Sequence, residues 1–227
     1  MLLLALDTST EICSAALWRD GEVRERAFPT VQAHGELLLP MVQELLTDSG
    51  LRLAQLDGLA VAGGPGSFTG LRIACGVAQG LAFGASLPLA TVGSLLALAE
   101  ASGAEHVLSC LDARMQEVYW AAYARDGASW REVSSPAVTA PGQLSLPTSS
   151  QWEGLGSGFA AYPEVASRLA PQLSLRPDLR PALAGAVARL AAARWTELAA
   201  PPQQAQPMYV RNKVALTTAE RAREGWR

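Results

Sequence analysis

The same short pattern occurs twice in this chain, once near the start and once near the middle. Residues 3–7 read Leu-Leu-Ala-Leu-Asp, and the turn sequence Arg-Asp-Gly follows at 19–21. Residues 108–112 read Leu-Ser-Cys-Leu-Asp, and Arg-Asp-Gly recurs at 125–127. In each copy an apolar strand ends in aspartate, and the strand after it turns back as a hairpin. Unrelated hairpins can look alike, but the recurrence favours an internal duplication and hence two related lobes.

The residues before the second copy predict a regular succession of strands and helices. Apolar runs predict three strands, over residues 2–6, 13–18 and 22–27. Leucines at helical spacing predict an amphipathic helix over 33–49, which ends before Gly50. The elements predicted next are a strand over 56–62, a helix over 71–83, a strand over 87–91 and a short helix over 94–101. The order is therefore β-β-β-α-β-α.

The second half of the chain repeats the three-stranded start and then becomes less regular. Its predicted elements are strands over 108–112, 117–123, 130–133 and 152–155, a Pro- and Ser-rich connection over 136–150, and helices over 163–169 and 181–198. We expect an α/β protein with an N-terminal lobe over residues 1–103 and a smaller second lobe over 104–200. Residues 201–227 form a polar tail that contains arginines.

Composition excludes several functions and locations. A net charge of −3 argues against a protein that grips nucleic acid alone, because phosphate binding needs a concentrated basic surface. The three cysteines lie far apart in apolar runs and indicate buried thiols in a reducing compartment, so we expect a cytoplasmic protein. Residues 73–99 carry no charge, but Pro88 and several glycines divide them into a helix and a strand. No membrane span is expected.

The glycine-rich turn over residues 63–70 separates a predicted strand from a predicted helix. Backbone N–H groups at such a turn can cradle an anion. The turn lacks the lysine of a phosphate-binding loop, since Leu71 follows Gly70, and Pro65 has no N–H to offer. We favour a purely structural turn, with an anion site as the alternative.

The two predicted hairpins carry the other polar clusters. Residues 7–10 read Asp-Thr-Ser-Thr, and residues 112–116 read Asp-Ala-Arg-Met-Gln. Such groups could bind phosphate or magnesium, but neither turn has a glycine that would let the backbone approach a phosphate closely. Turns stabilised by Asp, Ser and Thr side chains explain both without a ligand. We therefore expect no cofactor site.

The sequence gives little support for a metal site or for a catalytic serine. The chain has two histidines, His34 and His106, and Leu38 stands one helical turn after His34, where a metal pair would need a second histidine. No Gly-x-Ser-x-Gly motif is present, and Gly156-Ser157-Gly158 has the wrong spacing. We expect no metal ligand and no catalytic residue.

Three glycines in the helix after the glycine-rich turn lie four residues apart. Gly76, Gly80 and Gly84 share one helix face, and each costs roughly 1 kcal/mol relative to alanine in a helix interior. Three in a row indicate that another backbone comes close. That backbone belongs either to a second protein or to the chain's own sheet.

Several of these motifs together resemble one family. Residues 64–73, Gly-Pro-Gly-Ser-Phe-Thr-Gly-Leu-Arg-Ile, resemble the signature of the TsaB family closely. Further matches lie at residues 7–10, 34–40, 112–114 and 117–119, so the resemblance is strong over residues 1–124 and weak beyond. One departure is Ala74-Cys75, where the family more often has glycine.

The resemblance implies a fold and a role. TsaB-like proteins have the actin-like and sugar-kinase-like fold, whose duplicated β-β-β-α-β-α lobes are ribonuclease H-like, here with a reduced second lobe. They are non-catalytic subunits that bind and activate TsaD. That sister protein transfers a threonylcarbamoyl group to an adenosine beside the anticodon of tRNAs that read codons beginning with adenine. TsaE, a small ATPase, joins the same assembly, and tRNA is contacted only through the complex.

The resemblance also implies an interface. TsaB-like proteins use the two helices of the first lobe to bind TsaD, or to form a homodimer when TsaD is missing. The residues expected at this interface are Leu37, Met41, Leu45, Leu71, Gly76, Gly80 and Phe83.

Two enzymatic readings remain as alternatives. One is an actin-fold ATPase or kinase whose Asp7 and Asp112 hold a metal in the cleft between the lobes. The other is a degenerate relative of a metallopeptidase. The glycine-free hairpins argue against the kinase, and the absence of a histidine at Leu38 argues against the peptidase.

Overall fold

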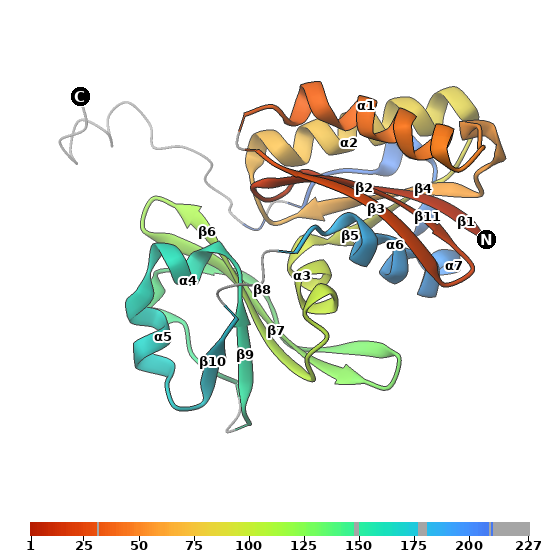
Figure 1. The fold of residues 1–227 in the computed structure, drawn as a ribbon. Coiled ribbons are helices and arrows are strands. Elements are labelled where there is room, and N and C mark those ends of the chain that lie inside the picture. Colours follow the sequence, from red (N-terminus) through yellow and green to blue (C-terminus); the bar gives the residue numbers. More distant parts are fainter. Residues whose placement is uncertain (31, 148–149, 177–180, 209, 211–227) are drawn as a thin grey trace, which may run out of the picture.

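The structure is a computed structural model that describes residues 1–30, 32–147, 150–176, 181–208 and 210 of the chain. It contains two sheets, one above the other in Figure 1, with helices packed on both. The first sheet is formed by β1 (Leu2–Asp7), β2 (Ile12–Arg19), β3 (Glu22–Pro29), β4 (Gly58–Gly64), β5 (Leu89–Gly93) and β11 (Ala199–Ala200). Their order across the sheet is β11-β5-β4-β1-β2-β3. β1 pairs antiparallel with β2 and parallel with β4. It therefore joins the antiparallel strands β1 to β3 to the parallel strands β4 and β5.

Helices cover both faces of this first sheet. Helices α1 (His34–Asp48) and α2 (Phe68–Ala85) lie side by side on one face (Figure 1). Helices α3 (Ser94–Ser102), α6 (Ala184–Ala193) and α7 (Trp195–Leu198) lie on the other side. Side chains of β1 alternate between the faces, with Leu4 and Leu6 toward α1 and α2 and Leu3 toward α6. A strand buried on both faces explains the unbroken apolar run at the start of the chain.

The second sheet repeats this beginning in a shorter form. Its strands are β6 (His106–Arg114), β7 (Glu117–Asp126), β8 (Ser129–Thr139), β9 (Trp152–Leu155) and β10 (Leu173–Leu175), in the order β10-β9-β6-β7-β8. Helices α4 (Ser157–Ala161) and α5 (Pro163–Leu169) cover one face, while α3 packs on the other. Short 3-10 helices complete the fold at Leu53–Gln55, Pro141–Gln143 and Pro202–Gln204. No α-helix lies between β8 and β9 in the residues described there, so the second lobe is the reduced copy.

The structure differs from the predicted domain limits near the C-terminus. The predicted second lobe extends to residue 200, whereas α6, α7 and β11 pack on the first sheet. The N-terminus of α6 is held there by two side chains of that sheet. Ser14 Oγ accepts from the Ala184 N–H at 3.1 Å, and Glu25 Oε1 accepts from the Gly185 N–H at 2.7 Å. The chain therefore returns to its first lobe after building the second.

Two further predictions can be compared directly. Strand β8 extends to Thr139, beyond the predicted strand over 130–133 and past Pro136. Because β8 is an edge strand, the missing N–H of Pro136 need not interrupt the ladder. The uncharged stretch over 73–99 divides into α2, β5 and α3, as predicted, and no helix among the described residues is long and apolar enough to cross a membrane.

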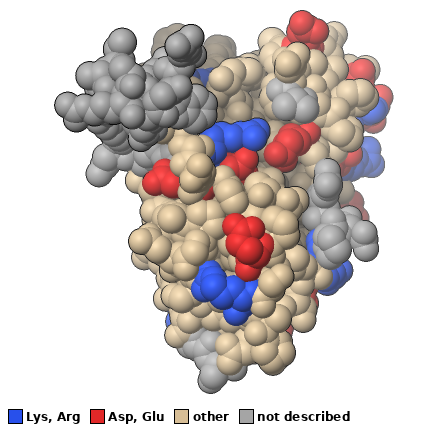
Figure 2. All heavy atoms as spheres, turned by 90° about the vertical axis from the view of Figure 1, so that its left-hand side faces the viewer, with Lys and Arg blue, Asp and Glu red and all other residues tan. Residues whose placement is uncertain are grey.

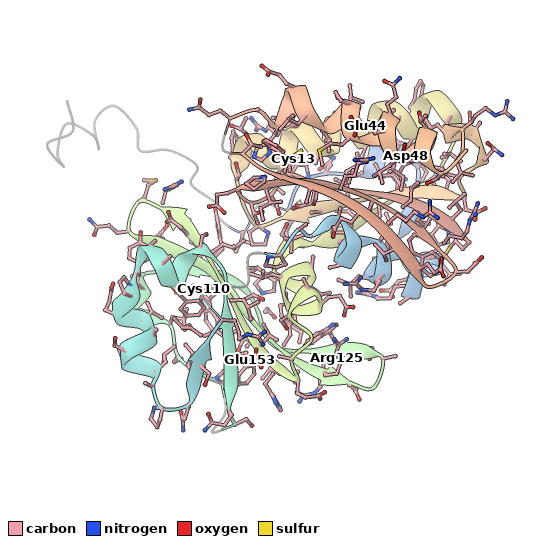
Figure 3. All side chains as sticks on the ribbon, in the orientation of Figure 1. Cys13, Glu44, Asp48, Cys110, Arg125 and Glu153 are labelled. Atoms are coloured by element: carbon pink, nitrogen blue, oxygen red, sulfur yellow. The ribbon has the colours of Figure 1, made fainter. Side chains whose placement is uncertain are left out.

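All three cysteines are buried and unpaired, as predicted. Cys13 lies in the first lobe and Cys110 in the second, far apart in Figure 3. Burial raises the pKa of Cys13 to about 11 and that of Cys110 to about 12, and Asp7 and Asp112 add to these shifts. These thiols stay protonated and behave as small apolar side chains.

Candidate functional site

The glycine-rich turn presses its backbone against the first hairpin. A Cβ atom on Gly70 would stand 1.8 Å from the carbonyl oxygen of Thr8, and one on Gly66 would stand 2.5 Å from that of Ser9. The Thr8 hydroxyl donates to the Gly70 carbonyl at 2.6 Å, and the Ser67 N–H donates to the Ser9 carbonyl at 2.8 Å. Contact between two backbones thus explains these glycines, which supports the structural interpretation of the turn.

The same turn starts α2. Ser67 is the N-cap residue, and its Oγ accepts a hydrogen bond from the Gly70 N–H at 3.2 Å. At the other end Ser86 takes a left-handed conformation, with φ of 56°, and closes the helix. Both ends of α2 are therefore fixed by local contacts.

The first hairpin buries a carboxyl group completely. Asp7 is 0% exposed, and its Oδ1 accepts from the Ser9 N–H at 3.0 Å, as expected for a turn stabilised by aspartate. Oδ2 has no hydrogen-bond partner within the described part of the chain. Burial raises the pKa of Asp7 to about 6, although the nearby Ser9 hydroxyl and N–H oppose the shift. A carboxyl group enclosed in this way is poorly placed to hold a metal ion for a ligand in the cleft.

The second hairpin repeats the arrangement with other residues. Asp112 Oδ1 accepts from the Arg114 N–H at 2.8 Å, and Ser157 Oγ accepts from the Asp112 N–H at 3.1 Å. Three residues in this turn, Arg114, Met115 and Gln116, have positive φ angles of 60°, 55° and 58°. Glycine is the residue that adopts such angles without strain, so side chains occupy a strained turn here.

Both hairpins face one pocket of about 350 Å³ between the lobes. The first lobe contributes Ser9, Thr10, Glu11, His34, Pro65, Gly66, Ser67, Phe68, Thr69 and Leu71, the second lobe contributes Leu111, Asp112, Ala113, Arg114, Met115, Tyr119 and Ser157, and the C-terminal segment contributes Met208 and Val210. The charges are mixed, since Glu11 and Asp112 accompany Arg114, which pairs with Asp112 at 3.0 Å. Figure 2 likewise shows acidic and basic side chains interspersed on a largely uncharged face. Asp112 lines the pocket, whereas Asp7 is buried and is not among the residues that line it.

The helix that would carry a metal pair carries a core residue instead. Leu38 is 0% exposed and packs in the core beneath α1. His34 is also buried, and burial lowers its pKa, which Glu11 partly opposes. Within the described ranges no group of three or more His, Cys, Asp or Glu side chains could hold a metal ion.

The seven expected interface residues separate into two groups. Met41 and Leu45 are buried in the core beneath α1, and Leu71 is buried beside the interlobe pocket that it lines, so all three are largely hidden from a partner. The resemblance implies an interface on these two helices, and helical spacing identifies an apolar stripe without saying what covers it. Leu37 is half-buried at the edge of this core.

The other expected residues lie on the outer surface of α2. Gly76 and Gly80 are exposed, and a Cβ atom on either would meet nothing within 4 Å. The same holds for Gly84, and Phe83 beside it is 67% exposed. These glycines therefore do not pack on the chain's own sheet.

The expected interface residues leave out an exposed apolar side chain of α1. Leu39 on α1 is 48% exposed and followed by the exposed Pro40, although the residues around them supply the core. The available signal was a leucine outside the 3.6-residue spacing of the core stripe. The name "helical face" is used below for Leu39 and Pro40 of α1 together with Gly76, Gly80, Phe83 and Gly84 of α2.

Comparison with known proteins identifies relatives over nearly the whole chain. A family model described as "TsaD: tRNA N6-adenosine threonylcarbamoyltransferase" matches residues 29–174. The Escherichia coli K12 tRNA threonylcarbamoyladenosine biosynthesis protein TsaB is 40% identical over 95% of this chain and 96% of its own. The Haemophilus influenzae protein of the same name is 42% identical over 74% of this chain and 77% of its own.

A solved structure agrees with these relatives. YeaZ from Pseudomonas aeruginosa superimposes with a TM-score of 0.84 at 39% identity, covering 92% of this chain and 99% of the other. The two-sheet architecture, the family model and this superposition confirm the predicted actin-like, ribonuclease H-like fold. By sequence and by fold, the chain belongs to the TsaB family.

Proposed function

We propose that this chain takes part in forming threonylcarbamoyladenosine on tRNA, as a non-catalytic subunit that binds and activates a TsaD-type catalytic subunit. The relatives' names supply the pathway, since they are threonylcarbamoyladenosine biosynthesis proteins. In this proposal a TsaE-type ATPase joins the same assembly, and tRNA is reached through the complex. The observation that carries the proposal is the helical face, which no described residue of the chain covers.

The glycines of the helical face favour a closely packed helix of a partner. Gly76, Gly80 and Gly84 each weaken α2 by roughly 1 kcal/mol relative to alanine, and no contact with another described residue requires them. The distance between two packed helices depends on the side chains at their contact, and glycine allows the shortest distance. A partner helix that lies along this stripe would explain why all three positions are glycine.

The apolar side chains beside the stripe favour the same use. Phe83 and Leu39 are among the few large apolar side chains that the described residues expose. Aromatic and aliphatic side chains of this kind supply much of the binding free energy when a partner covers them. Because α1 and α2 lie side by side, two helices of a partner can pack on them in a bundle (Figure 1).

The proposal of a non-catalytic role draws on three residues. Leu38 occupies the core position where a second histidine would be needed, Asp7 is enclosed, and Gly70 closes the turn onto the Thr8 carbonyl. None of these arrangements offers a metal ion or a phosphate an open ligand. No observation favours the kinase or the peptidase alternative over the role of a subunit.

The helical face also fits a second copy of the chain. A two-fold axis can bring the same surface of both copies together, so the isolated chain is proposed to form a homodimer through it. The homodimer and the complex with a TsaD-type subunit then exclude each other.

Gly80→Leu tests the proposal directly. The new side chain meets open space, so the variant should fold, and its helix should gain up to roughly 1 kcal/mol. It should hold a partner helix away and weaken binding of the host's TsaD-type subunit by at least about tenfold, or roughly 1.4 kcal/mol. Binding is measured by calorimetric titration, and tRNA modification is measured in the reconstituted system.

Gly142→Leu is the matched control. Gly142 is also exposed with nothing within 4 Å, but it lies in the second lobe. It should leave binding and modification unchanged. Wild-type binding and full modification by a well-folded Gly80→Leu would disprove the proposed interface.

A further inference from the structure

Glu100, near the end of α3, joins side chains from three other elements. Its Oε2 accepts hydrogen bonds from Arg125 Nη1 at 2.9 Å and from Trp130 Nε1 at 2.8 Å. Its Oε1 accepts from Arg189 Nε at 3.0 Å. The Arg125 guanidinium also lies 4.0 Å from the centre of the Trp130 ring. Both oxygens of one carboxylate are therefore bonded, each by a donor from a different part of the chain.

The donors come from both lobes. Arg125 and Trp130 lie on the β7–β8 hairpin, which extends beneath α3 (Figure 1), and Arg125 is labelled there in Figure 3. Arg189 lies on α6, which packs against β1 and β2 of the first sheet. Glu100 thus connects the far hairpin of the second sheet with a helix of the first lobe.

We propose that Glu100 is a latch between the lobes, which holds the two sheets at one angle and the interlobe pocket at one opening. The network formed by Glu100, Arg125, Trp130 and Arg189 is called the latch below. It is independent of the helical face, which lies on the opposite side of the first sheet.

Within the latch, the pair of Glu100 and Arg125 lies deeper than the other ion pairs of the described residues. The Glu100 side chain is 13% exposed and that of Arg125 is 20% exposed, whereas Arg26 and Arg194 and their acidic partners are all more than 40% exposed. Arg189 is 41% exposed, so its arm of the latch is closer to the surface. Charges shielded from water attract each other more strongly than exposed ones. Burial alone would raise the pKa of Glu100, but hydrogen bonds from Trp130, Arg189 and Arg125 outweigh it and lower the pKa. The carboxylate is stabilised in its charged form by these donors.

Apolar packing acts in the same direction as the latch. One continuous core includes residues of the first sheet, α3, α6 and the second sheet, among them Leu3, Leu98, Val187 and Tyr123. Two-lobed proteins that close around a ligand do so by hinge or shear motion between the lobes. Here that motion would have to break the latch and shear a shared core. We therefore expect a single interlobe geometry.

Glu100→Gln is the variant that tests the latch. Both carboxylate oxygens accept from N–H donors, so the amide NH₂ of glutamine must face a donor whichever way it turns. The volume stays the same, and the fold should survive. Spin labels are placed at exposed positions of the two lobes, by Gln43→Cys on α1 and Ser167→Cys on α5. The three natural cysteines are buried and should not react with the label.

The distance between the labels is measured by pulsed electron paramagnetic resonance. The labelled protein is diluted with unlabelled protein, so that distances between copies of the chain do not contribute. In the otherwise wild-type protein a single narrow distribution is then expected. In Glu100→Gln the distribution should be at least about twice as wide, because the lobes sample more angles. Amide exchange of the β7–β8 hairpin should accelerate by roughly tenfold in the same variant.

Glu153→Gln is the matched control. Glu153, labelled in Figure 3, lies in β9 and accepts from Arg176 Nη1 at 3.0 Å. Arg176 directly follows β10 of the same sheet, so this ion pair does not cross between the lobes. Its distribution should match the wild type. An unchanged distribution in Glu100→Gln, or equal broadening in both variants, would overturn the proposal. If Glu100→Gln fails to fold, Arg189→Gln removes one arm of the latch at a more exposed residue and is judged by the same readouts.

Discussion

Two glycines in the first three turns of α2 have opposite surroundings. Gly70 faces the Thr8 carbonyl, where a Cβ atom would stand at 1.8 Å, while Gly76 faces open space. Gly70→Ala should therefore destabilise the protein by about 3 kcal/mol, because backbone lies on both sides of the clash. Gly76→Ala should stabilise it by up to about 1 kcal/mol through helix propensity. Urea unfolding of both variants measures the difference, and equal effects would show that the close contact at Gly70 does not exist.

Asp7 makes stability depend on pH in a direction opposite to that of most surface carboxylates. Its pKa of about 6 in the folded protein exceeds the ordinary value of 3.8, so the folded state holds a proton that the unfolded state has lost between these values. The contribution of this proton to the free energy of unfolding is favourable and complete below pH 3.8, and it disappears as the pH rises through about 6. At pH 7 the cost is on the order of 2–3 kcal/mol.

Asp7→Asn isolates this contribution, since asparagine keeps the Oδ1 acceptor for the Ser9 N–H but does not titrate. The unfolding free energy of the wild type minus that of the variant should fall by about 2–3 kcal/mol between pH 4 and pH 7. Denaturant titrations at several pH values measure it. A difference that stays constant with pH would contradict the enclosed, partly unpaired carboxyl group.

Single residues also mark the limit of what the sequence predicts about the helical face. Of the residues predicted at an interface, Gly76, Gly80 and Phe83 are exposed, whereas Met41, Leu45 and Leu71 are buried within the chain. Glycines at four-residue spacing have no side chain to bury, so they indicate an uncovered surface more directly than leucines do. An apolar side chain on a helix fits the chain's own core and a partner equally well, and only the position of the sheet decides between them.

At the scale of elements, the two lobes hold their first hairpins in the same way. In the first lobe Gly66 and Gly70 press on the backbone after β1, and in the second Gly156 presses on the Cys110 carbonyl of β6, 2.1 Å from where its Cβ would be. In both cases the turn after a parallel neighbouring strand packs against the backbone of the central strand or of the residues that follow it, although Cys110 lies in the middle of β6. The duplication predicted from the Leu-Leu-Ala-Leu-Asp pattern thus extends to the packing of this turn on the central strand.

The sequence predicts the elements that pack against neighbours close in sequence. It does not predict where an element lies when it packs against residues far away in the chain. Strands β1 to β3 and helices α1 and α2 are predicted by the spacing of apolar residues and by the turn residues between the elements. A helix was also predicted over residues 181–198, but nothing in its small apolar residues says which sheet it covers. Its place depends on Ser14 and Glu25, about 160 residues earlier, which bond its first N–H groups. Side-chain hydrogen bonds of this range leave no periodic signal.

Across the whole molecule, the return of α6 joins the lobes into one folding unit. The first sheet has α1 and α2 on one face, but its other face is covered mainly by α6, which follows the second lobe in sequence. Strand β11 then pairs with β5, and Gln79 of α2 donates to the Pro202 and Ala205 carbonyls at 3.1 and 2.8 Å. The predicted boundary at residue 103 therefore divides the sequence without dividing the core.

This arrangement predicts that the first 103 residues cannot fold alone. Such a fragment retains β1 to β5 and α1 to α3 but exposes the face of the sheet that includes Leu3, Ala5, Ala60 and Val92, all buried in the full chain. Burial of apolar surface contributes about 25 cal/mol per Å², and a domain is stable by only about 5–15 kcal/mol, so an uncovered sheet face removes most of that margin. We expect fragment 1–103 to show no cooperative thermal transition in circular dichroism. A chain that ends at residue 210 is the control, because it keeps every described helix and strand and should melt cooperatively near the wild-type temperature. A cooperative transition of fragment 1–103 near that temperature would show instead that the first lobe is an independent domain, and that its stability does not depend on α6.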